Sequence, residues 1–270
     1  MYYQSQQAIK AIILLMFSGF IFRLHHTGEI IMFINPQYTA FSQIASILFL
    51  FLFFIQVPRI FISKEQAEDH DYCTILGCNH EMIGVRTIPL KNVVIYFIII
   101  LPIVTGFLLP YKDLGAAEAV KRGICYTTNS THTDHSGKVG TSNNVFHEMI
   151  GSPVLMLNND NFSVFVNNIL TYPEVFEGKP IELEGFIYMD ETYSHEYPLL
   201  ARFLVTHCVA DAHVTGLLLS TDDKNRRNVD EWVRVNGEIK LMENAENTIP
   251  IVLVKQWKKI ERPKATYIYP

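Results

Sequence analysis

Residues 38–58 read YTAFSQIASILFLFLFFIQVP and residues 92–111 read NVVIYFIIILPIVTGFLLPY, and these two stretches decide the fold. No charged residue lies within 30–58 or within 92–111. A helix needs about 20 mainly apolar residues to cross the roughly 30 Å hydrocarbon core of a bilayer. Buried core helices are the alternative, but 48–55 is apolar on every side of a helix, which favours contact with lipid. Both stretches therefore predict membrane-spanning helices.

A shorter apolar run, 11–22, lies between Lys10 and Arg23. Twelve residues rise only about 18 Å, so these two basic side chains would have to reach along the helix to the membrane surfaces. A cleaved signal peptide is the rival interpretation. Because no small-residue cleavage site follows Phe22, a retained helix is favoured.

The N-terminal part is therefore expected to be a transmembrane domain, residues 1–111, of a multi-pass protein of the cell membrane. Its helices are expected near 7–24, 39–58 and 91–110. Pro102 should kink the third helix. Together with Gly19 and Gly106, it offers close-packing surfaces to other helices.

Residues 112–160 look like a linker, because 127–144 is rich in Thr, Ser, Asn and Gly and lacks apolar periodicity. Residues 161–170 fit either a short helix or a strand.

From Lys179 onward the pattern becomes that of β-strands. Five runs are expected to be strands: 181–189, where Gly185 suggests a bulge, then 199–209, 214–219, 232–239 and 249–260. Five strands in about 80 residues, separated by turns, predict a five-stranded barrel of the oligonucleotide-binding (OB) type within 161–270. A β-sandwich is the alternative. The expected fold class is two to three transmembrane helices followed by an all-β, OB-like domain.

The orientation follows from basic residues near the helix ends. With three helices and an inner N-terminus, the inner side holds five basic residues and the outer side four. The inner set is Lys10, Arg59, Lys64, Arg86 and Lys91, and the outer set is Arg23, Lys112, Lys121 and Arg122. This small excess predicts an extracytoplasmic C-terminal domain.

Charge and motifs exclude several classes of protein. The net charge is −5, and residues 171–270 hold 12 Lys and Arg against 16 Asp and Glu. OB domains that bind nucleic acid need a positive groove, so nucleic acid is not an expected partner. No Walker loop and no GxSxG, HExxH or GxGxxG motif occurs, so we expect no catalytic activity.

One candidate zinc site lies in the loop between the second and third helices. Its pattern is H-x2-C-x4-C-x-H, formed by His70, Cys73, Cys78 and His80. Imidazole and thiolate are ligands that Zn²⁺ prefers, and four of them complete a tetrahedron. The spacing matches no standard zinc finger, and a solvated acidic loop with incidental cysteines is the alternative.

A second candidate is the segment His207-Cys208-Val209-Ala210-Asp211-Ala212-His213. On a regular strand His207 and Cys208 point to opposite faces. A turn after the long apolar strand would free the side chains from this alternation. Cys208, Asp211 and either His207 or His213 would then converge on a zinc ion. The alternative is that Cys208 packs in the barrel wall as a small apolar residue.

Six short motifs, in this order, resemble a family of bacterial membrane proteins described as permease subunits and found mainly in Firmicutes. They are INP at 34–36, LPIVTGFLLP at 101–110, AVKRGI at 119–124, GKPIELEGFIY at 178–188, ARF at 201–203 and CVADA at 208–212. The likeness spans nearly the whole chain.

The resemblance implies a partner, because such proteins are encoded beside a multi-spanning permease and are thought to form a two-component complex with it. Some members are linked to zinc-responsive gene sets. The family usually has two adjacent cysteines before Val-Ala-Asp, and here the first is His207. This exchange argues against a strict dithiol role but keeps the capacity to bind zinc.

We therefore expect an accessory subunit of a membrane permease complex, with the lipid bilayer and a permease as partners and a link to zinc handling. The alternative is a stand-alone metal-binding or sensing protein of the cell envelope.

Overall fold

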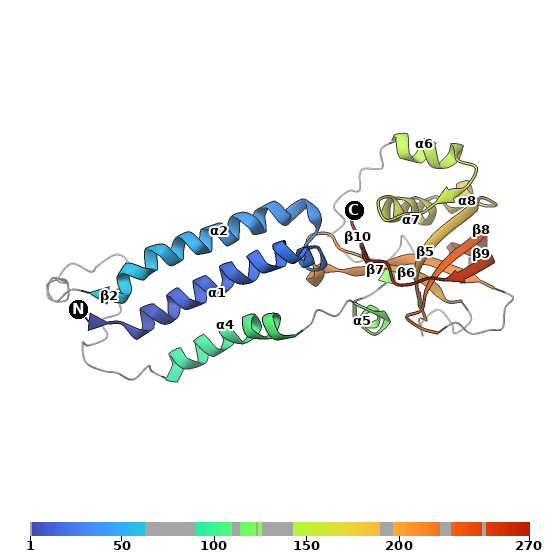
Figure 1. The fold of residues 1–270 in the computed structure, drawn as a ribbon. Coiled ribbons are helices and arrows are strands. Elements are labelled where there is room, and N and C mark those ends of the chain that lie inside the picture. The colour runs from blue at the N-terminus through green and yellow to red at the C-terminus, as the bar shows by residue number, and fades with distance from the viewer. Residues whose placement is uncertain are drawn as a thin grey trace. The chain divides into compact units, whose positions relative to one another are not determined.

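The computed structural model describes residues 2–62, 90–109, 114–122, 124–125, 143–189, 197–221, 228–244 and 247–270. The chain forms two compact units, residues 1–112 and 113–270, which are described separately. Figure 1 shows helices in the first unit and a β-barrel with short helices in the second.

Three long helices make up the N-terminal unit: α1 (Ser5–Thr27), α2 (Thr39–Gln56) and α4 (Leu90–Leu108). All three are long and apolar enough to cross a membrane. The first is longer than its apolar core, because it also includes His25 and His26. It ends at Gly28, whose φ of 76° lies in the left-handed region that terminates helices.

Short elements connect the long helices. The turn into α2 holds the 3-10 helices η1 (Glu29–Met32) and η2 (Pro36–Tyr38), where the Asn35 side chain accepts the N–H of Gln37. After α2 come η3 (Val57–Ile60) and β2 (Phe61–Ile62), and β2 pairs antiparallel with β1 (Tyr2–Tyr3).

Polar side chains join α1 to α2. In the middle, the Ser18 hydroxyl donates to the Ser46 carbonyl at 2.9 Å, and the Ser46 hydroxyl donates to the Ser18 carbonyl at 3.0 Å. Toward the C-terminal end of α1, the His25 ring lies 2.7 Å from the Ser42 hydroxyl. Hydrogen bonds between apolar helices help to fix their pairing.

The contact between α1 and α4 lies near the C-terminal ends of both helices. The Arg23 guanidinium donates to the Phe107 carbonyl at 3.1 Å and lies 5.5 Å from the Phe107 ring. A Cβ added to Gly106 would lie 2.8 Å from the Phe20 ring. Gly106 therefore provides close packing inside this chain, whereas a Cβ added to Gly19 would meet nothing within 4 Å.

Five strands form the barrel of the C-terminal unit: β5 (Pro180–Tyr188), β6 (Leu199–Leu204), β7 (His213–Ser220), β8 (Trp232–Asn244) and β9 (Asn247–Lys259). They are hydrogen-bonded in the order β5-β6-β7-β9-β8 and back to β5, so the barrel is closed (Figure 1). Only the β7–β9 pair is parallel among these five contacts. The expected OB-like barrel is confirmed.

Glycines permit close approach of strands in the wall. A Cβ on Gly185 would lie 2.5 Å from the Ala201 carbonyl oxygen of the neighbouring strand. The pairing of β5 with β8 runs through Gly185 without a shift, so the expected bulge is not there. The register shifts instead between Asn236 and Gly237, where β8 faces β9.

Helix α7 (Phe162–Thr171) belongs to the same apolar core as the barrel. Phe162, Val166 and Ile169 are fully buried with inward residues of the strands, which include Leu183, Leu200 and Val235. Residues 161–170, for which helix and strand were both open, are therefore mainly helical. The four-residue helix α8 (Pro173–Phe176) follows and buries Phe176.

Residues 112–160, expected to be a linker, contribute elements to the C-terminal unit: α5 (Ala116–Arg122), β3 (Ile124–Cys125), α6 (Asn143–Gly151) and β4 (Leu155–Met156). Ala116, Ala119, Met149 and Leu155 are buried in the core. These elements are too short to show a periodic pattern alone, and they are held by tertiary contacts. Most of the polar segment 127–144 lies outside the described residues.

Helix α6 is fixed by a lysine distant in sequence. The Lys179 ammonium donates to the carbonyls of Met149 at 2.9 Å and Ser152 at 3.0 Å, and also to that of Ile150. Carbonyls at a helix C-terminus lack helical partners and carry partial negative charge. Lys179 therefore caps α6 against the start of β5.

Ion pairs balance charge across β5, β8 and β9. Arg234 pairs with Glu184, and Glu238 lies 2.6 Å from Lys240 and 2.7 Å from Lys255. Hydrogen bonds and the positive charge of these two lysines lower the pKa of Glu238 to about 2. These carboxylates and basic groups therefore neutralise one another on this wall of the barrel.

Candidate functional site

The candidate site is the loop between β6 and β7. These strands pair from Leu199↔Leu218 to Leu204↔His213. Near the loop, the short strand β10 (Tyr267–Ile268) flanks β6 and β3 flanks β7, so both edges of the hairpin are covered. The loop holds the 3-10 helix η4 (Val209–Asp211), with Cys208 at its N-cap.

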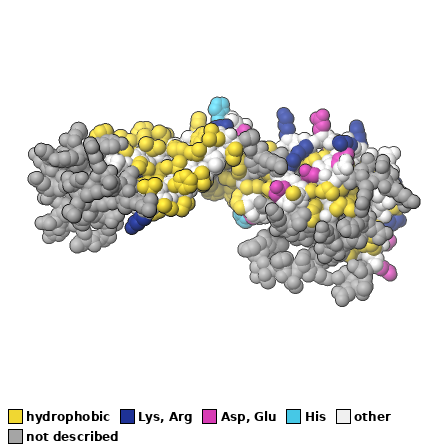
Figure 2. Space-filling model, turned by 90° about the horizontal axis from the view of Figure 1, so that it is seen from below, with side chains coloured by type: hydrophobic (Ala, Val, Ile, Leu, Met, Phe, Trp, Pro, Cys, Tyr) yellow, Lys and Arg dark blue, Asp and Glu magenta, His cyan; other side chains and the backbone are white. Residues whose placement is uncertain are grey.

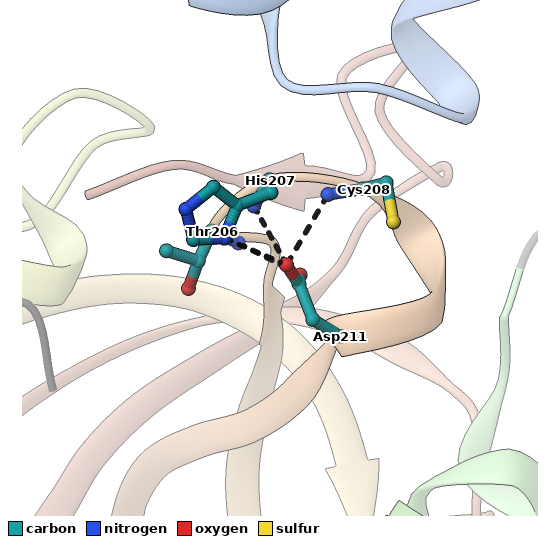
Figure 3. A network of polar contacts seen from close by, with 4 residues as sticks. All are labelled: Thr206, His207, Cys208 and Asp211. Carbon is teal, nitrogen blue, oxygen red and sulfur yellow. Dashed lines mark hydrogen bonds and ion pairs between the residues drawn. The ribbon is translucent and has the colours of Figure 1, made fainter. Parts of the chain in front are cut away.

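Asp211 organises the loop (Figure 3). One carboxylate oxygen accepts the backbone N–H of Thr206 at 3.1 Å. The other accepts the N–H of His207 at 2.8 Å and that of Cys208 at 3.3 Å, and it lies 3.1 Å from Nδ1 of His207. An acid at the third position of a helix that binds back to the N-cap is a capping-box arrangement.

The same contacts set the ionisation of Asp211. Burial acts to raise its pKa, but the N–H groups of His207, Cys208 and Thr206 and the His207 ring together outweigh burial. The net effect is a pKa below the ordinary value, because hydrogen bonds to the charged form favour it. Asp211 is thus held as a carboxylate by the turn that it stabilises.

The two candidate ligands next to Asp211 diverge. Figure 3 shows the His207 ring and the Cys208 sulfur on opposite sides of the Asp211 carboxylate. The His207 side chain is 68% exposed, and Cys208 is a half-buried free cysteine. His213 begins β7, opposite Leu204. Regular strand geometry ends at Leu204, because three consecutive N–H groups, those of Thr206, His207 and Cys208, turn toward Asp211.

Of the predicted ligands, the structure brings together His207 and Asp211. Within the described parts of the chain, no three His, Cys, Asp or Glu side chains are grouped so that they could hold a metal ion. The predicted loop site of His70, Cys73, Cys78 and His80 lies outside the described residues. Zinc binding at Cys208, with Asp211 and His207 or His213, stays a prediction.

Sequence reasoning did not single out Arg202 as a site residue, although it lies within one of the motifs. Its side chain is 2% exposed in the second strand of the barrel. It donates to the side chain of Asn159 at 2.8 Å and to the carbonyl of Ala265 at 3.1 Å, and it lies 5.1 Å from the Trp232 ring. Charged residues are seldom buried without a partner. A single arginine within the otherwise apolar strand 199–204 therefore could have indicated Arg202 from the sequence.

Burial lowers the pKa of Arg202 to about 10, although the charge of Glu184 opposes the shift. The guanidinium therefore stays protonated at neutral pH. Its contacts join β6 to the segment before α7 and to the C-terminal segment. This arrangement fastens two flanking segments to the barrel wall.

Apolar helices and a closed barrel with an internally hydrogen-bonded loop define a membrane-associated protein that carries an OB-like domain. Family models match both parts: the DUF1980 N-terminal domain matches residues 9–125 and the DUF1980 C-terminal domain matches residues 133–270. The chain belongs to the DUF1980 family. The family resemblance seen in the sequence is thereby confirmed.

Two relatives are similar to this chain. The UPF0703 protein YcgQ of Bacillus subtilis is 24% identical, and the match covers 96% of this chain and 98% of that protein. A Streptococcus mutans protein named "Putative two-component membrane permease complex subunit" is 32% identical over 121 residues, which are 44% of each chain.

Proposed function

We propose that this chain is an accessory, non-catalytic subunit of a membrane permease complex. Its helices would contact the permease within the bilayer, and its OB-like domain would lie on the extracytoplasmic side. The main support for this proposal is that the side chains of the apolar helices are largely exposed at the surface of the chain. We compared the 18-residue stretch of highest hydropathy in each helix. The share of that stretch buried within the chain is 6% for α2 and for α4, against 28% for α1.

The chemistry of the exposed surface supports an accessory role. Figure 2 shows hydrophobic side chains along the helices of the N-terminal unit. The exposed residues in the middle of α2 are all apolar and include Ile47, Phe51 and Phe54. A solute path needs polar groups along its length, so these helices are better suited to packing than to transport. The printed name of the Streptococcus mutans relative points in the same direction.

We further propose that the complex takes part in zinc handling. This proposal rests on Cys208 and His207 being adjacent in an exposed loop and on the resemblance stated above. The His207 ring and the Cys208 sulfur lie on opposite sides of the Asp211 carboxylate. A zinc site here therefore requires the loop to rearrange or a partner to contribute ligands.

The decisive experiment is co-expression of the tagged chain with a multi-spanning permease encoded beside it. After extraction in mild detergent, size-exclusion chromatography with light scattering should show one complex of both proteins. An unrelated tagged three-helix membrane protein serves as the control. If this chain elutes alone while the permease is present and folded, the subunit role is refuted. Elemental analysis of the same fractions tests for zinc.

A further inference from the structure

The N-terminal half of α4 has exposed apolar side chains. Val93, Val94, Ile95, Phe97 and Ile98 are 46–63% exposed. At 100° per residue these five positions span about 200° of the helix circumference, and Asn92, Tyr96 and Ile99 on the remaining side are half-buried. By contrast, Ile103 in the second half is 3% exposed, near the contact with α1. The first half of α4 therefore has little cover from the described part of this chain.

Pro102 places a polar group within this exposed half. A residue at position 102 would normally donate its N–H to the carbonyl of Ile98, but proline has no N–H. The Thr105 hydroxyl donates to the carbonyl of Pro102 at 3.0 Å, which is a different acceptor. Lipid tails offer no donor, and a donor from a neighbouring helix is one of the ways in which membrane helices tolerate proline. The Ile98 carbonyl thus favours a neighbour with an N–H or O–H group.

The other helices of this chain are poor sources of such a donor. The exposed side chains in the middle of the described helices α1 and α2 are apolar, and Ser18 and Ser46 are buried against each other. Among the described residues, Tyr96, half-buried on α4 itself, is a donor that a second copy could offer. A different membrane protein with a polar side chain at mid-depth fits better.

We propose that the first half of α4 is the contact surface for a transmembrane helix of the partner protein. In this contact a Ser, Thr, Asn, Gln or Trp side chain of the partner donates a hydrogen bond to the Ile98 carbonyl. This inference rests on the proposed function and specifies which surface of the N-terminal unit contacts the permease.

The test uses the full chain in its native membrane with the photo-crosslinking residue p-benzoylphenylalanine. The probe replaces Phe97 in one variant and Phe54 on α2 in the control, because both side chains are 63% exposed. We expect the probe at position 97 to link to a transmembrane segment of one multi-spanning protein, identified by mass spectrometry, with little linkage from position 54.

A second variant tests the hydrogen bond. Pro102→Ala restores the internal N–H, so the partner's donor loses its acceptor. Loss of one hydrogen bond between membrane helices corresponds to a roughly 3- to 30-fold decrease in the cross-linked complex. The amount of chain in the membrane should not change. An unchanged cross-link in Pro102→Ala would overturn the donor contact.

The remaining outcomes separate this inference from the proposed function. If the complex co-purifies but position 97 links only to lipid, or if positions 97 and 54 link equally, the α4 surface is wrong and the subunit role stands. A link between two copies of this chain replaces the partner with a homodimer. If no complex co-purifies, both proposals fail.

Discussion

Replacing Asp211 with alanine should destabilise the C-terminal unit by an amount that the loop geometry predicts. The change removes the acceptor of three backbone N–H groups and of the His207 ring, at 2.8–3.3 Å. The Asp211 side chain is 35% exposed, so water replaces part of these hydrogen bonds. Losing a cap of this kind costs about 1–2 kcal/mol. For a unit of this size, that lowers Tm by roughly 2–8 °C.

The full-length protein in detergent is suitable for the measurement. Its only two tryptophans, Trp232 and Trp257, both lie in the barrel strands β8 and β9. Tryptophan fluorescence therefore follows unfolding of the C-terminal unit without a signal from the membrane helices. Glu261→Ala, at an exposed carboxylate of the C-terminal segment, is the matched control and should leave Tm unchanged.

The difference between Asp211→Ala and wild type should depend on pH. The folded-state pKa of Asp211 is lowered, so its contribution is fully present above the unfolded-state pKa of about 3.9. The contribution is lost as pH falls through the folded-state pKa. The Tm difference should therefore be constant between pH 7 and pH 5 and shrink below about pH 4. Equal Tm values for both proteins at pH 7 would refute the argument that Asp211 holds the loop.

Three further variants test other parts of the structure. Lys179→Met should release the last carbonyls of α6, cost about 1–3 kcal/mol and speed amide hydrogen exchange in α6, whereas unchanged exchange would contradict the cap. Gly106→Leu places a side chain against Phe20, so it should separate α4 from α1 and reduce disulfide cross-linking between cysteines introduced in them; undiminished cross-linking would show that the helices tolerate the bulk. Cys208→Ser should abolish any zinc-dependent rise in Tm, and a wild-type Tm that ignores zinc at neutral pH would refute zinc binding there.

The parts of the fold that the sequence predicts are those with long-range hydrophobic patterns. Charge-free stretches indicate the membrane helices, because each must be apolar over about 20 residues. Alternating residues indicate the five barrel strands, because one side of each strand faces the core. Elements such as α5 and β3 carry no such pattern. They are a few residues long and form only against the finished barrel.

The candidate site was predictable in part. A turn after the β6 strand was expected, and Cys208, Asp211 and either His207 or His213 were expected to converge on a zinc ion. The structure shows the turn and places the His207 ring beside Asp211. The role of Asp211 as a cap could not be predicted. Every residue except proline has a backbone N–H, so the sequence does not distinguish an aspartate that caps a turn from one that binds a metal. Arg202 shows the opposite case, since its partners Asn159 and Ala265 are distant in sequence and only the fold brings them together.

The parallel contact between β7 and β9 has a consequence for biosynthesis. Strand β9 pairs with β8 on one side and with β7 on the other, so the barrel cannot close before β9 has been made. The membrane helices leave the ribosome long before that point. Until then β7 and β8 present open strand edges, which invite pairing with other chains. A stop codon just before β9 would leave those edges permanently open, so the truncated chain should aggregate at the membrane or be degraded.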